Sequence, residues 1–120
     1  MEKTLSEYMT LSKNIDDLKF DKKLKVAVLS SFTINGLDEI LHVRCSEIGI
    51  NYQSYLAGYN QYNQEFLNPE SDYYKFSPDI TFLIIDIRSF LGDHFHYPYN
   101  ISNNERKLLV KEKINHLENI

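Results

Sequence analysis

The stretch "KVAVLSSFTING", Lys25 to Gly36, decides the fold class of this chain. Its apolar run, Val26 to Leu29, consists of small and β-branched residues, which is typical of a parallel strand buried on both faces. Two serines and a threonine follow, and the segment from Leu37 to Ile48 then repeats apolar residues at helical spacing before Gly49. The order of strand, short loop and helix is that of open α/β proteins, which bind ligands or hold nucleophilic serines at such loops.

The flanking sequence continues the alternation of helices and strands. Apolar spacing over 4–20 predicts one helix or two short ones, and "DKKLK" then forms a polar connection into the first strand. The runs at 50–58 and 80–87 predict two further strands, with a helix between them that ends at about Leu67.

The end of the chain predicts a loop and a last helix. "GDHFHYPYN" has the glycine, proline and asparagine of a loop, and Ser102 begins the helix. Glu105 follows Ser102 at the spacing of a capping box, in which each side chain binds the backbone N–H of the other residue. The apolar face of this helix consists of Leu108, Leu109, Ile114 and Leu117.

Strands that alternate with helices predict a three-layer αβα fold with a mostly parallel sheet, of the flavodoxin-like kind. We expect this sheet to be truncated after three strands. Residues 1–24 form an amino-terminal helical segment, and 25–120 form the partial α/β domain.

Charge and hydropathy exclude two classes of partner. The chain has 120 residues and a net charge of -4, and its 13 basic residues are scattered among 17 acidic ones, so no basic stripe suits nucleic acid. No apolar stretch approaches the roughly 20 residues of a membrane helix, and the first residues lack the order of a signal peptide. We expect a cytoplasmic protein that binds neither nucleic acid nor membrane.

The carboxyl ends of parallel strands share one rim, where ligands bind. Arg88 is suited there to clamp a carboxylate or phosphate. The alternative is structural: the serines cap the next helix, the amides solvate a loop, and Asp86 pairs with Arg88. The predicted ligand-binding residues of this rim are Ser30, Ser31, Thr33, Gly58, Asn60, Gln61, Asp86 and Arg88.

Catalytic and metal chemistry have weaker signals. Ser30 or Ser31 is a candidate nucleophile, and Asp93 with His96 has the D-x-x-H spacing that some serine esterases use. Asp93, His94 and His96 lack a further ligand nearby, so we expect no metal site. No glycine-rich phosphate-binding loop occurs.

The serines after the first strand, Gly58 after the second and "PDITFLIID" as the third resemble the SGNH hydrolase fold. Active members of that family have Gly-Asp before the nucleophilic serine and an oxyanion-binding asparagine after the third strand. Here Ser31 lies near the nucleophile position without Gly-Asp, and Arg88 stands in place of the asparagine. Asp93 and His96 come too early in the chain for the catalytic pair of that family.

A more specific resemblance covers about Lys25 to Leu91. "VLSSFT" and "YNQYNQEFLNPESDYYKFSPDITFLIIDIR" resemble the amino-terminal domain of FkbH-like proteins of the haloacid dehalogenase (HAD) superfamily, subfamily IIIC. The residues in matching order are Gln61, Gln64, Glu65, Leu67, Pro69, Ser71, Phe76, Pro78 and Asp79.

This resemblance implies an SGNH-like module that is degenerate as a hydrolase. In FkbH-like proteins the catalytic D-x-D-x-T aspartates and their magnesium belong to a downstream HAD domain, and this chain has no such motif and no cofactor of its own. The implied partners are that HAD domain, an acyl carrier protein of natural-product (polyketide) biosynthesis, or a second copy of this chain. The alternative is a small serine esterase or acyltransferase that uses Ser31 or Ser30.

Overall fold

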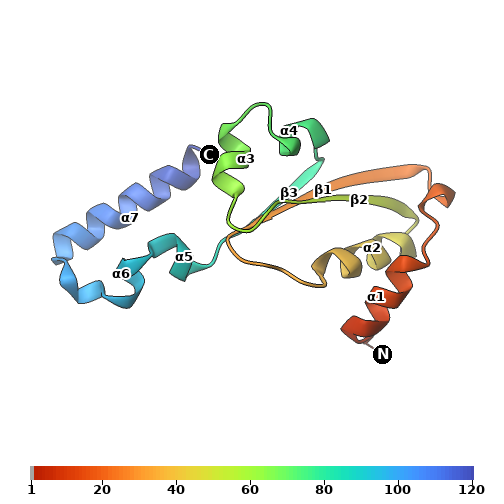
Figure 1. Cartoon of the computed structure of the whole chain (residues 1–120), viewed down its shortest axis with the longest axis horizontal. Helices are drawn as coiled ribbons and strands as arrows, with labels where there is room; N and C mark the ends of the chain where they lie inside the picture. Colours follow the sequence, from red (N-terminus) through yellow and green to blue (C-terminus); the bar gives the residue numbers. More distant parts are fainter. Residues whose placement is uncertain (1) are drawn as a thin grey trace.

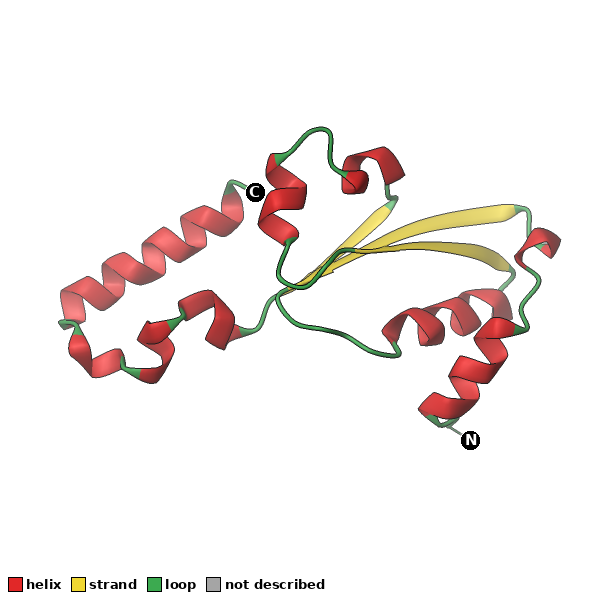
Figure 2. Cartoon of the chain, in the orientation of Figure 1, coloured by secondary structure: helices red, strands yellow, loops and turns green. Residues whose placement is uncertain are grey.

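The computed structural model describes residues 2–120 of the chain as a small parallel sheet with helices on both faces (Figures 1 and 2). Its elements in chain order are α1 (Leu5–Lys13), η1 (Asp17–Lys19), β1 (Lys22–Ser30), α2 (Leu37–Glu47), β2 (Ile50–Leu56), α3 (Tyr62–Leu67), α4 (Asp72–Phe76), β3 (Ile80–Ile84), α5 (Ile87–Leu91), α6 (Asp93–His96), η2 (Pro98–Asn100) and α7 (Asn103–Glu118).

The sheet has the strand order β2-β1-β3, and both pairings are parallel. The α/β class, the parallel sheet and the flanking helices predicted from the sequence are thus confirmed. β1 is the central strand, and for this reason Val26 to Ser30 are all buried. The register pairs Val26 with Ile80 and Ala27 with Tyr55, so each strand ends at the same rim.

Alternate residues of β1 build two separate cores. Val26 and Val28 pack with Tyr52 of β2 beneath α2, and α1 lies against α2 on the same side (Figure 1). Ala27 and Leu29 point to the opposite face, where they pack with Tyr62 of α3. This two-sided burial produces the three layers and explains the uninterrupted apolar run in β1.

Several predicted boundaries were wrong. β1 begins at Lys22 rather than Val26, because Lys22 to Lys25 already pair with β2, so all of "DKKLK" except Asp21 belongs to the strand. β3 ends at Ile84 rather than residue 87, because its partner β1 ends there at Ser30 and leaves no strand to bind. The next residues instead form α5.

Short helices form in two segments where the sequence predicted no helix. α4 lies in the segment before β3, and Gly92 has a positive φ of 59° before α6, which with η2 occupies the predicted loop. The predicted capping box of the last helix is confirmed: Ser102 Oγ accepts from Glu105 N–H at 3.2 Å, and Glu105 Oε2 accepts from Ser102 N–H at 2.6 Å.

The segment from α5 to α7 leaves the sheet as an arm (Figure 1). The radius of gyration is 18.3 Å, against about 14 Å for a compact domain of this length. The predicted apolar face of α7 is correspondingly exposed, with 61% of Leu108 accessible to solvent. Among residues 2–120, no strand pairs with the outer edge of β3. The side chains of Ile80 and Phe82 in this strand are exposed.

Candidate functional site

The two serines at the end of β1 serve the backbone. Ser31 is 1% exposed, its Oγ accepts a hydrogen bond from Asp86 N–H at 2.7 Å, and its own N–H donates to Ile84 O at 3.0 Å. Ser30 is also buried, and its Oγ donates to the carbonyl of Phe32. Ser31 therefore ties the end of β1 to the end of β3, with its hydroxyl directed away from solvent.

The candidate catalytic pair lies on the arm, away from the serines. Asp93 and His96 are both exposed at the ends of α6, and the His96 ring packs edge-on against Phe95. No hydrogen bond joins either residue to Ser30 or Ser31 within residues 2–120. The geometry gives the esterase alternative no working triad.

Three of the eight predicted rim residues line a hollow, and the other five do not. Ser30 and Thr33 line one of about 270 Å³ between the ends of β1 and β2. Asn60 lines a second, larger one, and its backbone N–H is bound to Ser30 O at 3.2 Å with a left-handed φ of 51°. Ser31 and Asp86 are bound to each other beneath the rim.

Gly58, Gln61 and Arg88 line neither hollow. The Gln61 side chain folds back on Gly58, so a Cβ on this glycine would lie 2.8 Å from Gln61 Oε1 and the flexible end of Gln61 would have to move. Arg88 is exposed, and its guanidinium lies 6.0 Å from the centre of the Phe95 ring. Its predicted role as an anion clamp stays a prediction.

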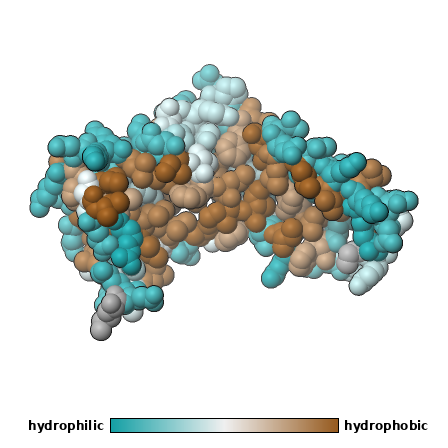
Figure 3. Space-filling model, turned by 180° about the vertical axis from the view of Figure 1, so that it is seen from behind, coloured by the Kyte–Doolittle hydropathy of each residue, from teal (hydrophilic) through white to brown (hydrophobic). Residues whose placement is uncertain are grey.

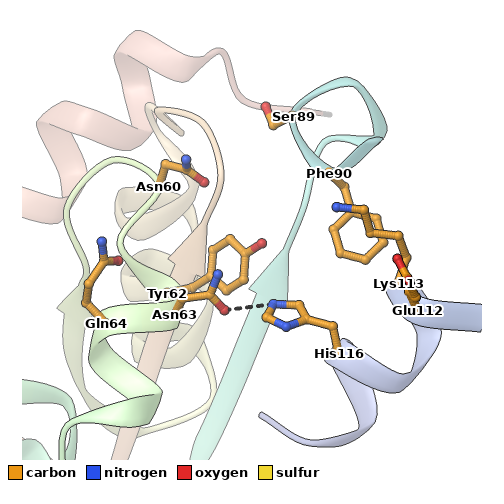
Figure 4. Close-up of a pocket in the computed structure, with 9 residues that line it drawn as sticks. All are labelled: Asn60, Tyr62, Asn63, Gln64, Ser89, Phe90, Glu112, Lys113 and His116. Carbon is orange, nitrogen blue, oxygen red and sulfur yellow. Dashed lines mark hydrogen bonds between the residues drawn. The ribbon is translucent and has the colours of Figure 1, made fainter. Parts of the chain in front are cut away.

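The larger hollow, the α3–α5–α7 pocket, has a volume of about 510 Å³ (Figure 4). His116 of α7 faces Asn63 of α3, with 3.1 Å between His116 Nε2 and Asn63 Oδ1. Lys113 extends over the Phe90 ring of α5, 5.3 Å from its centre. The lining residues are Asn60, Tyr62, Asn63, Gln64, Ser89, Phe90, Glu112, Lys113 and His116.

Tyr62 connects this pocket to the core. Its ring is only 6% exposed and packs against Ala27 and Leu29, whereas its hydroxyl points into the pocket (Figure 4). Like any tyrosine hydroxyl it is protonated at neutral pH and can donate, and burial raises its pKa further. Of the lining residues, the predicted ligand-binding set contains only Asn60, because most of the others lie on helices that no local pattern in the sequence joins.

The string of residues from Gln61 to Asp79 that resembles FkbH-like proteins includes contacts that hold α3 and α4 on the sheet. Glu65 accepts hydrogen bonds from the Tyr55 hydroxyl of β2 at 2.6 Å and from the Tyr73 N–H of α4 at 3.2 Å. The buried Ser71 donates to Glu65 O at 2.7 Å. Glu65 and Ser71 therefore have a structural role in this chain.

Asp79 of the same string sets the start of β3. Its carboxylate accepts from Lys25 N–H at 2.9 Å, and its own N–H donates to Lys25 O at 2.8 Å. Lys25 Nζ donates to Phe76 O at 3.2 Å. The Pro-Asp pair therefore aligns β3 with β1.

A chain of hydrogen bonds through Ser12, His42 and Asp17 lies on the α1 side of the molecule. Ser12 Oγ is 2.7 Å from His42 Nδ1, and Asp17 Oδ1 is 2.8 Å from His42 Nε2. Serine hydrolases attach these groups to the opposite ring nitrogens. Here the three residues join α1 and η1 to α2, a contact that the sequence did not indicate.

The described part of the chain has neither a metal-binding cluster nor a membrane-spanning helix. Within residues 2–120, no group of three or more His, Cys, Asp or Glu side chains has the arrangement to hold a metal ion. None of the helices described is long and apolar enough to span a membrane.

The fold is shared with a solved structure. A crystal structure of the N-terminal part of the protein BF1531 from Bacteroides fragilis, which contains a phosphatase domain and is complexed with Mg, matches this chain with a TM-score of 0.78. The match covers 98% of this chain at 24% identity, and this chain spans 30% of that one. This likeness shows the fold. No protein-family model matches the chain, and no curated protein does.

Proposed function

We propose that this chain is the amino-terminal, SGNH-like module of an FkbH-like protein and acts as a binding or docking module for a HAD phosphatase domain. Its task is to present a substrate or an acyl carrier protein to that domain, which holds the catalytic aspartates and their magnesium. The observation that carries the proposal is the fold of nearly the whole chain, which is that of the N-terminal part of a phosphatase-containing protein.

The state of the serines supports docking over hydrolysis. A nucleophilic serine needs an accessible hydroxyl bound to a base. The Ser31 hydroxyl is buried and bound to Asp86 N–H instead. A chain that keeps this fold without the hydrolytic machinery is suited to binding.

The open side of β3 is the docking surface in this proposal. Ile80 and Phe82 lie on the same face of the sheet as Val26 and Val28, yet 42% and 44% of their areas are exposed because α2 covers only the other strands. Figure 3 shows hydrophobic surface across the middle of one face of the molecule. An uncovered edge strand with apolar side chains is energetically suited to pair with further polypeptide.

The first experiment is to isolate the native polypeptide from its own cells with an antibody against this chain. We expect either a severalfold heavier product that contains D-x-D-x-T, or the short chain together with a HAD-domain protein. A short chain that recovers no HAD-domain protein overturns the proposal.

A matched pair of variants tests the docking surface. If the HAD domain is a separate polypeptide, Phe82→Glu should lower its recovery about tenfold, because a charge replaces an apolar contact. If both belong to one polypeptide, Phe82→Glu should make the joined domains separable by limited proteolysis. Leu18→Glu is the control, since Leu18 is 92% exposed on η1, away from β3. Equal behaviour of the two variants excludes β3 as the docking surface.

A further inference from the structure

We propose that the α3–α5–α7 pocket binds a small molecule that carries an oxyanion, a carboxylate or a phosphate, with Tyr62 and Lys113 as its principal donors. This inference goes beyond the docking role, since it assigns a ligand to a site formed wholly within this chain.

The Tyr62 hydroxyl is the first reason. Buried tyrosines usually find a hydrogen-bond partner for this group. Tyr62 is 94% buried as a residue, but its hydroxyl is open to solvent, has no protein partner within residues 2–120 and points into the pocket (Figure 4). A ligand acceptor would satisfy it without any movement of the ring.

The balance of donors and acceptors is the second reason. Lys113 forms no ion pair with another residue of 2–120, and its ammonium extends across the pocket wall (Figure 4). The Asn63 carbonyl oxygen is bound to His116, so the amide nitrogen of Asn63 remains as a donor. Ser89 adds a hydroxyl from the opposite wall. Such a donor-rich lining favours an acceptor-rich anion.

The presence of Glu112 and the volume of the pocket limit the kinds of ligand that fit. Glu112 is the acidic residue of the lining, and it favours a ligand that also bears a hydroxyl or amino donor. The pocket of about 510 Å³ lies within the usual range for small-molecule sites, roughly 300–1,000 Å³. The geometry therefore suits a small anion that also carries a hydrogen-bond donor.

The test is a titration of the whole chain, followed by the ¹H–¹⁵N NMR signals of the Asn63 side-chain amide and of the Ser89 and Phe90 backbone. The probes are glycolate, inorganic phosphate and, as a neutral control, ethylene glycol. We expect saturable shifts with glycolate, with phosphate or with both, and none with ethylene glycol. Glycolate alone indicates a carboxylate ligand, and phosphate alone indicates a phosphoryl ligand.

Single variants decide whether the pocket is responsible. Lys113→Met should weaken binding about tenfold and Tyr62→Phe severalfold, since each removes one donor. Lys111→Met is the control, because Lys111 is an exposed lysine of the same helix outside the pocket. Absence of saturable shifts with either anion, or equal weakening by the Lys111 and Lys113 variants, overturns the inference. Neither outcome depends on a partner protein, so it leaves the docking proposal intact.

Discussion

Ser31 Oγ accepts a hydrogen bond from the backbone N–H of Asp86 at 2.7 Å, and this bond joins residues 55 positions apart at the carboxyl ends of β1 and β3. The bond engages the hydroxyl of the serine that lies nearest to the nucleophile position in the sequence comparison. Ser31, a candidate nucleophile by sequence, therefore has a structural role at the rim of the sheet.

Ser31→Ala should destabilise the chain by about 1–3 kcal/mol, because it leaves the Asp86 N–H without its partner in a buried place. Urea unfolding followed by circular dichroism measures this change. Ser89→Ala, at an exposed serine of α5, should change stability by no more than about 0.5 kcal/mol. Equal effects from the two substitutions would mean that the Ser31 bond contributes little.

A serine-directed phosphonate reagent should label neither Ser30 nor Ser31, because both are buried and neither is bound to a histidine within residues 2–120. Mass spectrometry of the treated protein makes the measurement. Ser12 should also stay unlabelled, although it contacts His42. Stoichiometric labelling that disappears in Ser31→Ala would instead support the esterase hypothesis.

Glu65 should contribute strongly to the stability of the folded chain, although it lies on a short helix. Glu65→Ala should lower the free energy of unfolding by about 2 kcal/mol, because the carboxylate accepts from both Tyr55 and Tyr73. A double-mutant cycle with Tyr55→Phe should give a coupling of about 1 kcal/mol. Glu70→Ala is the control at an exposed acid, and additive effects of Glu65→Ala and Tyr55→Phe would contradict a direct interaction.

Three of the nine tyrosines should ionise late in the folded protein. Burial first, and then a hydrogen bond to a carboxylate, raises the pKa of Tyr52 and of Tyr55, and burial raises that of Tyr62. A raised pKa in the folded state means stability that is complete below the unfolded value of about 10 and is lost as pH rises above it.

Absorbance at alkaline pH, with and without denaturant, measures this difference. We expect the denatured chain to titrate near pH ~10. Tyr55→Phe should remove one late-titrating group from the native curve. Coincident native and denatured curves would contradict the burial of these phenols.

The sequence predicts elements whose causes are local. The apolar run of β1 and the Ser102–Glu105 capping box each depend on neighbouring residues, and both are observed. The end of β3 was misplaced because it depends on where β1 ends, which the sequence of β3 does not contain.

The candidate site was harder to predict for a related reason. The rim residues lie at the same edge of the sheet, but this does not determine which of their side chains point into a pocket. The Ser31 side chain points instead toward the backbone of Asp86. The α3–α5–α7 pocket joins Asn63 to His116, 53 residues further along the chain. Only the path of the arm brings them together, and no spacing rule encodes that path.

The capping box of α7 should make the start of the arm sensitive to acid. Hydrogen bonds from the backbone and hydroxyl of Ser102 lower the pKa of Glu105 below its ordinary value of about 4.3. A lowered folded pKa means stability that is present above the ordinary value and is lost as pH falls through the folded one. Amide hydrogen exchange at the first turn of α7 should therefore accelerate as pH falls below about 4, beyond the intrinsic trend. Glu105→Gln, which can still accept the bond but cannot ionise, should remove the acid-dependent part. Identical pH profiles for the two proteins would mean that the Glu105 charge does not hold this end of the helix.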